Sequence, residues 1–183
     1  GFVQFWEVPP GSATAQNGRW VDAPGQDLFT LFTWSRPCLP FIAEDLGYIT
    51  PDVHEMMTYF GFPGMKILTF GFSGDIAQNP HAPHNITARC IAYTGTHDTN
   101  TVRGWFEHEV SDDQKNIIFR YIGGSIGADQ INRILIRFAM ISPAGTVIIP
   151  MQDILGLGDE ARMNRPGTAE GNWEWRLLPE QAT

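Results

Sequence analysis

The chain has 183 residues, enough for one domain with a buried core, and a formal net charge of −8. Nucleic-acid binding depends on clustered Lys and Arg, so this acidic chain with scattered basic residues is not expected to bind nucleic acid. No apolar stretch is long enough to span a bilayer, so no membrane partner is expected. Two cysteines, Cys38 and Cys90, are too few for a disulfide framework, and we expect buried thiols in a cytoplasmic setting.

The N-terminal part is rich in turn signals, among them Pro9-Pro10-Gly11 and Asn17-Gly18. A short apolar helix is predicted over 26–34. The next helix begins after Thr50, with Pro51 at its first position, and ends at Gly61 and Pro63.

The later helices carry clear local signals. Ser111 and Gln114 form the pattern of a capping box, which predicts a helix ending at Gly123-Gly124. A further helix places Ile131, Ile134, Leu135 and Phe138 on one face and stops at Pro143.

Short apolar runs alternate with these helices and predict strands over 39–43, 65–70, 90–93 and 146–149. Strands of this kind are typical of a parallel sheet covered on both faces, as in α/β proteins. They are too few to close a (β/α)₈ barrel, so they form either half of one or a small open sheet. Polar residues follow each strand, as in TIM barrels, whose active sites lie at the carboxyl ends of the strands; this pattern favours the half-barrel.

Glu44 and Asp98 are the candidate catalytic carboxylates. Glu44 directly follows the run 39–43, where a carboxyl at a strand end can act as a general acid. The structural alternative, a carboxylate that caps the next turn or pairs with Arg, is commoner for an isolated Glu. Asp98 lies in a loop of small and hydrogen-bonding residues with His97, suited to binding sugar hydroxyls; the alternative is a helix cap by Asp98 or Thr96.

Aromatic residues lie in or near these loops. Flat pyranose faces pack on such rings, so they suit a glycan cleft, although core packing explains any single one as well. The set is Trp6, Trp20, Phe70, Phe72 and Trp105.

A metal site is not expected. His81, His84 and His97 accompany several carboxylates, but Pro83 interrupts the first pair and the helical spacing of a zinc motif is absent. Neither a nucleophile elbow nor a phosphate-binding glycine loop is present.

Several segments together resemble the amylomaltase (disproportionating enzyme) family, glycoside hydrolase family 77, whose members are 4-α-glucanotransferases. The resemblance extends in order over nearly the whole chain. It is carried by Ile42-Ala43-Glu44-Asp45-Leu46-Gly47, Phe60-Gly61-Phe62-Pro63-Gly64-Met65-Lys66, Tyr93-Thr94-Gly95-Thr96-His97-Asp98, Gly104-Trp105-Phe106, Glu160-Ala161-Arg162-Met163-Asn164 and Gly171-Asn172-Trp173.

The resemblance implies that residues 1–183 are the C-terminal half of a catalytic TIM barrel of the α-amylase type, strands 5 to 8, without a complete second domain. It implies Glu44 as general acid/base and Asp98 as the carboxylate that stabilises the transition state. His97, Asn164 and Phe70 are implied as substrate-binding residues. The expected substrates are maltooligosaccharides or starch-type glucans, with no metal or organic cofactor, in the cytoplasm, or in a plastid if the source is a plant.

In this family the nucleophile is an Asp within a short sequence motif. Gly1-Phe2 resemble the last two residues of that motif, so the nucleophilic Asp is expected upstream of this chain. A retaining glycosidase needs this second carboxylate close to its acid/base. We therefore expect the chain alone to be inactive and to need the missing N-terminal half of the same enzyme. The rival interpretation is a non-catalytic α-glucan-binding module or regulatory half, although a natural half-barrel would have to cover its open strand edges.

Overall fold

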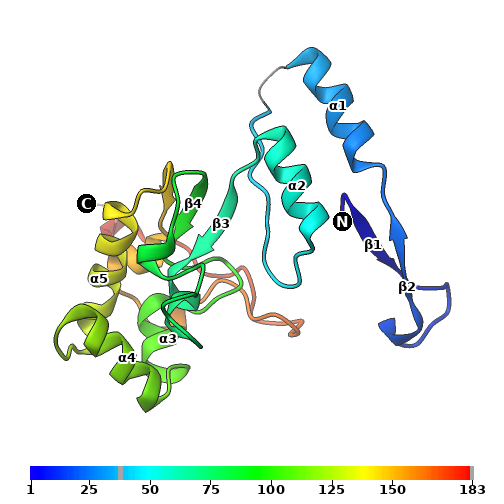
Figure 1. Cartoon of the computed structure of the whole chain (residues 1–183). Helices are drawn as coiled ribbons and strands as arrows, with labels where there is room; N and C mark the ends of the chain where they lie inside the picture. Colours follow the sequence, from blue (N-terminus) through cyan, green and yellow to red (C-terminus); the bar gives the residue numbers. More distant parts are fainter. Residues whose placement is uncertain (37–38, 182–183) are drawn as a thin grey trace. The chain divides into compact units, whose positions relative to one another are not determined.

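A computed structural model describes residues 1–36 and 39–181, and its chain divides into two compact units, Gly1–Gly64 and Met65–Thr183. Figure 1 shows the elements of both units. The expectation for Cys38 lies outside the described residues. Cys90 is buried, as expected, and its Sγ donates a hydrogen bond to the Thr87 carbonyl (3.1 Å). Among the described residues, no helix is both long and apolar enough to cross a bilayer.

The first unit begins with an antiparallel hairpin, in a region that its turn signals predicted to be rich in loops. Strand β1 (Gln4–Glu7) pairs with β2 (Arg19–Asp22), and the short 3-10 helix Ala15–Asn17 lies between them. The Arg19 guanidinium donates to the Glu7 carboxylate across the pair (2.8 Å). The opposed Trp6 and Trp20 contact each other edge to face. Such cross-strand pairs stabilise two short strands that carry no clear local signal.

Helix α1 (Gly25–Ser35) and helix α2 (Pro51–Phe60) confirm the two helices predicted for this unit. The strand predicted over 39–43 is wrong: this segment is irregular, and Phe41 and Ile42 are exposed. Its backbone contact is one hydrogen bond from the Ala43 N–H to the Pro63 carbonyl (2.9 Å), which is not a strand ladder. Pro40 has no N–H to donate, and apolar character without a paired neighbour does not make a strand.

The second unit contains a three-stranded sheet of order β3-β4-β5. Its strands are β3 (Gly64–Ile67), β4 (Cys90–Tyr93) and β5 (Thr146–Ile148). The β4 and β5 strands are parallel, with Ala92 opposite Val147. The predictions for β4 and β5 are confirmed. The strand predicted over 65–70 ends early, because the Ile67 N–H donates to the His81 ring (3.0 Å) and the chain turns into the 3-10 helix Leu68–Phe72.

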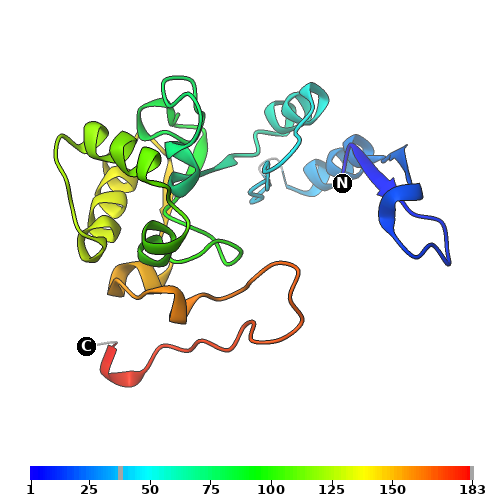
Figure 2. The ribbon, with the colours of Figure 1, turned by 90° about the horizontal axis from the view of Figure 1, so that it is seen from below.

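Four α-helices accompany this sheet, namely α3 (Val102–His108), α4 (Asp112–Ile122), α5 (Ala128–Ile141) and α6 (Met151–Leu155). The predicted capping box of α4 is present, with Ser111 and Gln114 bonded reciprocally, and Gly123 ends the helix. Ile131 and Leu135 of α5 are fully buried against the core. After α6 the chain continues as a long irregular stretch (Figure 2), with short 3-10 turns at Asp159–Ala161 and Pro179–Gln181.

The core of this unit explains two of the aromatic residues singled out by the sequence. Phe72 and Trp105 are buried in the core cluster with Leu68 and Ala92, so their role is packing. Phe70 is 40% exposed, which leaves its ring accessible. The unit is an α/β structure built on a partly parallel sheet, and its assignment to a barrel stays a prediction.

Candidate active site

The loop between β4 and α3 carries His97 and Asp98, and Asp153 of α6 holds both of its ends. Asp153 is 1% exposed; its Oδ2 accepts from the Thr94 hydroxyl (2.5 Å) and its Oδ1 from the Val102 N–H (2.8 Å). Burial raises the pKa of Asp153, and these two hydrogen bonds offset part of that effect. One buried carboxylate therefore fixes the end of the strand and the beginning of the helix.

Hydrogen bonds within the loop set its shape. The Thr96 N–H donates to the Thr99 hydroxyl (2.8 Å), which in turn donates to the Thr96 carbonyl (3.1 Å). The N-cap of α3 is Thr101, whose hydroxyl accepts from the Gly104 N–H (3.0 Å). The alternative interpretation, in which Asp98 or Thr96 caps the helix, is therefore wrong. The Asp98 carboxylate is directed to other partners.

The structure brings Asp98, His97 and Asn164 together, and their roles stay predictions. The Asn164 side-chain amide donates to Asp98 Oδ1 (2.6 Å), and His97 Nε2 lies 3.3 Å from the same oxygen. The side chains of His97 and Asp98 are each half exposed, so a ligand can reach them. A carboxylate, an imidazole and an amide around one point can bind the hydroxyls of a sugar.

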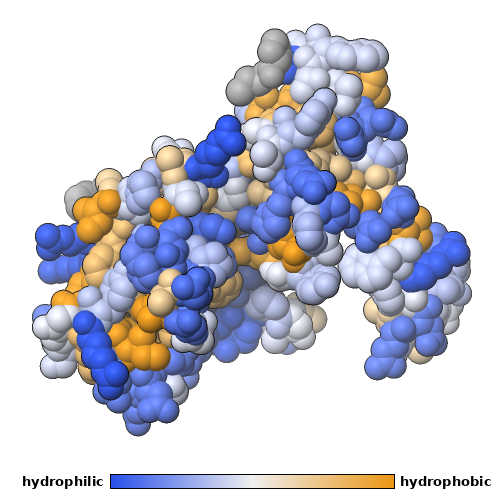
Figure 3. Space-filling model, viewed as in Figure 1, coloured by the Kyte–Doolittle hydropathy of each residue, from blue (hydrophilic) through white to orange (hydrophobic). Residues whose placement is uncertain are grey.

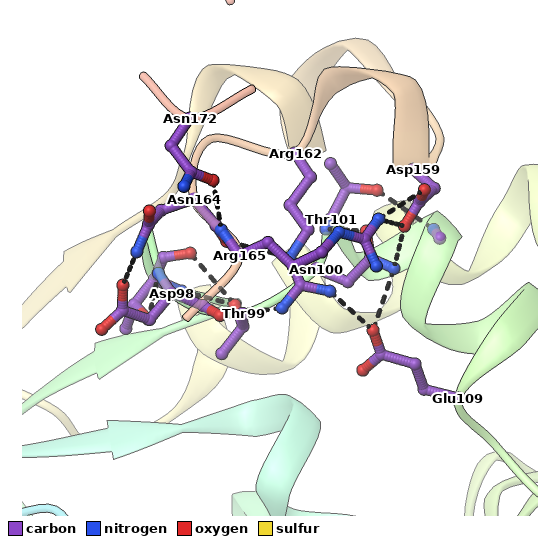
Figure 4. A network of polar contacts seen from close by, with 12 residues as sticks. Asp98, Thr99, Asn100, Thr101, Glu109, Asp159, Arg162, Asn164, Arg165 and Asn172 are labelled. Atoms are coloured by element: carbon purple, nitrogen blue, oxygen red, sulfur yellow. Dashed lines mark hydrogen bonds and ion pairs between the residues drawn. The ribbon is translucent and has the colours of Figure 1, made fainter. Parts of the chain in front are cut away.

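Arg162 ties this group to the segment after α6 (Figure 4). Its guanidinium donates to the Asp98 carbonyl, the Asn164 carbonyl and Glu109 Oε1, each at 3.0 Å. The side chain is only 15% exposed, so the fork is held in one geometry. Arg162 therefore fixes the backbone of Asp98 and of Asn164, whose side chains contact each other.

A second layer of polar contacts supports Glu109 and the same loop (Figure 4). Buried Asn100 donates to Glu109 Oε1 (3.0 Å) and to Asp159 Oδ1 (2.8 Å). Arg165 forms an ion pair with Asp159 (3.0 Å). Because the network shares its acceptors, each member limits the movement of the others.

A cavity of about 180 Å³ lies beside this group. His97 and Trp173 line it, and their rings are 5.1 Å apart between centroids. Gln152, Asp153 and Arg162 also line the cavity.

Sequence reasoning did not assign roles to Asp153, Arg162 or Trp173. For Asp153 the available signal was its place in the polar pair Gln152-Asp153 after the last predicted strand. For Arg162 and Trp173 it was the resemblance of the C-terminal segments to the family.

The other two predicted site residues make contacts of their own. Phe70 packs edge to face on His81, and its carbonyl accepts from Asn79 (2.9 Å). Glu44 belongs to the first unit, where its side chain is exposed and lines an apolar cavity of about 410 Å³ with Phe41 and Phe62. Its role as the general acid/base stays a prediction.

The histidines singled out by the sequence are engaged in other contacts. His81 Nδ1 accepts from the Ile67 N–H, and His84 Nδ1 is 2.9 Å from the Tyr121 hydroxyl. Over residues 1–36 and 39–181, no group of three or more His, Cys, Asp or Glu side chains is arranged to hold a metal ion.

Comparison with known proteins decides the family. A sequence model described as 4-alpha-glucanotransferase matches residues 1–181. The chain belongs to the 4-alpha-glucanotransferase family. The 4-alpha-glucanotransferase of Synechocystis is 48% identical over 183 residues and that of Aquifex aeolicus 46% over 177 residues. These alignments cover 99% and 97% of this chain, but 36% of each relative. The chain therefore spans little more than a third of the length of these relatives.

A plant relative and two solved structures agree with this. The Arabidopsis thaliana 4-alpha-glucanotransferase, described as chloroplastic/amyloplastic, is 46% identical over 97% of this chain and 30% of its own length. The amylomaltase of Streptococcus agalactiae in complex with acarbose matches with a TM-score of 0.92 and 38% identity. It covers 100% of this chain, which spans 36% of that protein. The amylomaltase of Corynebacterium glutamicum is 18% identical with a TM-score of 0.68, over 94% of this chain and 30% of that one, and supports the fold alone.

Proposed function

We propose that this chain is the C-terminal part of a 4-α-glucanotransferase that moves α-1,4-glucan segments between maltooligosaccharides with retention of configuration. The observation that carries the proposal is the contact of Asp98 with both Asn164 and His97, the last of which lines a cavity. The match to the family over residues 1–181 supports it. The acarbose complex of the Streptococcus agalactiae amylomaltase makes a glucan the natural ligand to test.

The proposed reaction has two displacements. In the first, an Asp carboxylate supplied by a segment outside these 183 residues attacks the anomeric carbon, while Glu44 gives a proton to the departing glucan oxygen. In the second, Glu44 takes the proton of an acceptor 4-hydroxyl, whose oxygen attacks the same carbon and releases the Asp. Glucan transfer therefore returns both carboxyl groups to their starting states.

Asp98 and its partners act on the sugar rather than on the transferred proton. The Asp98 carboxylate, which accepts from Asn164 and whose backbone carbonyl accepts from Arg162, binds sugar hydroxyls and stabilises the positive charge that develops at the anomeric carbon. His97 donates a hydrogen bond to a neighbouring hydroxyl. No step in this scheme needs a metal or an organic cofactor.

The proposal includes the remainder of the barrel. In this arrangement β3, β4 and β5 are the sixth, seventh and eighth strands, and residues 39–43 stand where the fifth strand belongs. The relatives are long enough to supply the other strands, since this chain covers 36% of them. The exposed segment 39–43 would then gain a neighbouring strand.

Incubation with maltotriose, followed by chromatography of glucose and longer oligomers, tests the proposal. The chain alone is expected to give no ladder, and co-expression with the rest of the enzyme is expected to restore it. Glu44→Gln and Asp98→Asn in the restored enzyme should each abolish the ladder, while Glu174→Gln, an exposed carboxylate, should not. Glucan binding without any transfer after restoration would instead support a non-catalytic binding module.

A further inference from the structure

Trp173 has a backbone conformation that does not suit its side chain. Its φ is +63°, in the left-handed region, where a bulky residue is strained. Over the described ranges 1–36 and 39–181, every other residue with positive φ is a glycine, including Gly171 two positions earlier. Such strain persists only where the surroundings enforce it, and it gathers at functional sites.

Hydrogen bonds on both sides of Trp173 enforce this conformation. Its N–H donates to the Met163 carbonyl (2.7 Å), and its carbonyl accepts from Arg176 (2.7 Å). The preceding Asn172 accepts from the Arg165 N–H (2.8 Å; Figure 4). It also donates to the Thr168 carbonyl (3.0 Å). The turn is thus built to place one side chain.

Core packing does not explain why that side chain is Trp. The residue is 53% exposed, so much of its apolar surface gains nothing from burial. Its ring contacts His97: the indole and imidazole rings are 5.1 Å apart between centroids and tilted by 33°. Both rings line the cavity beside Asp98.

We propose that Trp173 is a positioning residue for His97. Its indole holds the imidazole so that Nε2 stays toward Asp98 Oδ1 at the rim of the cavity, where a sugar hydroxyl would bind. The strained turn is the means by which the chain places the indole there. This inference rests on the proposed function for its ligand, and on the ring contact alone for its geometry.

The test uses the NMR signal of the His97 ring proton on Cε1, assigned by its loss in His97→Gln. The indole should displace this signal by its ring current. Trp173→Asn removes the ring and keeps a residue that tolerates positive φ, so the His97 signal should move to the position of an exposed histidine. Trp173→Phe should retain part of the displacement. The exposed His108 should not change, and Trp175→Phe is the matched control.

An unmoved His97 signal in folded Trp173→Asn would overturn the proposal. If that variant does not fold, Trp173→Phe decides, because a phenyl ring in place of the indole should still alter the displacement. A maltotriose titration of the same variants in the restored enzyme should then show about tenfold weaker binding by Trp173→Asn, the size of one lost hydrogen bond to a charged partner. Failure of the restored enzyme with unmodified Trp173 to bind maltotriose would count against the proposed function, whereas the NMR result judges Trp173 by itself.

Discussion

At the scale of single residues, Asp98 shows which features of the site can be predicted from the sequence. The sequence marks it as a polar residue after a buried strand, but its partner Asn164 lies 66 positions later. Nothing in the spacing of the two residues predicts their contact, because it depends on how the segment after α6 folds back. The family resemblance supplied both residues, and the structure shows that they meet.

Replacing Asn164 tests that contact. Asn164→Ala removes the amide that donates to Asp98 Oδ1, so the carboxylate loses a partner that fixes its orientation. Maltotriose affinity, measured by calorimetry in the restored enzyme, should fall by about threefold to tenfold, since Asp98 is half exposed and water replaces part of the bond. Asn116→Ala, at an exposed position on α4, is the control and should leave affinity unchanged. Equal affinities for both variants would contradict the assigned role of Asn164.

Asp153 should give the chain a characteristic dependence on pH. Burial raises its pKa in the folded state above the ordinary value of 3.8, so folding favours the protonated form. The contribution of Asp153 to stability is therefore greatest below that ordinary value and falls as pH rises through the raised pKa. Asp153→Asn has no such loss, so its stability relative to the unmodified chain should increase with pH.

Urea unfolding of both proteins between pH about 4 and about 7 measures this difference, at about 1.4 kcal/mol for each unit by which the pKa is raised. Glu174→Gln, an exposed carboxylate, should show a constant difference from the unmodified chain. A difference for Asp153→Asn that does not vary with pH would show that the carboxylate is not destabilised by burial.

At the scale of elements, the sequence predicts well those helices and strands that are specified by their own residues. The capping box at Ser111 and the amphipathic face of α5 specify their helices without help from the rest of the chain. β4 and β5 are rich in apolar or β-branched residues and were found as expected. Two failures share one cause, since segment 39–43 and the β1–β2 hairpin both depend on whether a partner strand is present. β3 ends early for another reason, the hydrogen bond from the Ile67 N–H to the His81 ring.

In the candidate site, too, features set by neighbouring residues were predictable and features set by distant ones were not. His97 and Asp98 were predictable because they follow β4 directly, whereas the support from Asp153 and Arg162 depends on contacts between distant segments. Polar residues after strands are visible in a sequence, but the hydrogen bonds that orient them are not. The sequence therefore indicates the chemistry of the site better than its geometry.

The end of α4 offers a test at this scale. Gly123 ends the helix at φ +81°, and a Cβ there would meet no atom within 4 Å. Gly123→Ala should therefore lose about 1 kcal/mol of stability through backbone strain rather than collision. The neighbouring Gly124 is equally uncrowded but does not have positive φ, so Gly124→Ala should be neutral or slightly stabilising. Thermal unfolding of the pair checks this, and equal losses would show that the strain argument is wrong.

At the scale of the whole molecule, apolar side chains lie open on both units, and Figure 3 shows apolar patches on the face it presents. In the first unit they include Trp34 at 79% exposure and Ile42 at 48%. In the second they lie on α5, β5 and α6, at Met140, Ile141, Ile148, Met151 and Ile154. Soluble monomers seldom expose large contiguous apolar patches, and parallel sheets are normally covered. We infer that the remainder of the enzyme covers β5, an edge strand of the described sheet.

Ile148→Thr should have different effects on the chain alone and on its reconstitution with the rest of the enzyme. Ile148 is 40% exposed, and Thr is also β-branched, so the stability of the chain alone should change by less than about 0.5 kcal/mol. If the rest of the enzyme packs on β5, the same change removes about 1.5 to 3 kcal/mol of burial, and reconstitution should weaken by tenfold or more. Urea unfolding measures the first effect, and titration of the chain with the remaining part, followed by maltotriose transfer, measures the second.

The comparison with Leu178→Thr makes this test specific. Leu178 is 50% exposed near the C-terminal turn and lies outside the β5 edge, so its replacement should alter neither measurement. A loss of reconstitution only for Ile148→Thr would identify the edge of the sheet as the surface that the rest of the barrel covers. Equal reconstitution by both variants would mean that the missing part meets the chain elsewhere. In that case the open edge of β5 would require another cover, because an exposed apolar edge strand promotes association between copies.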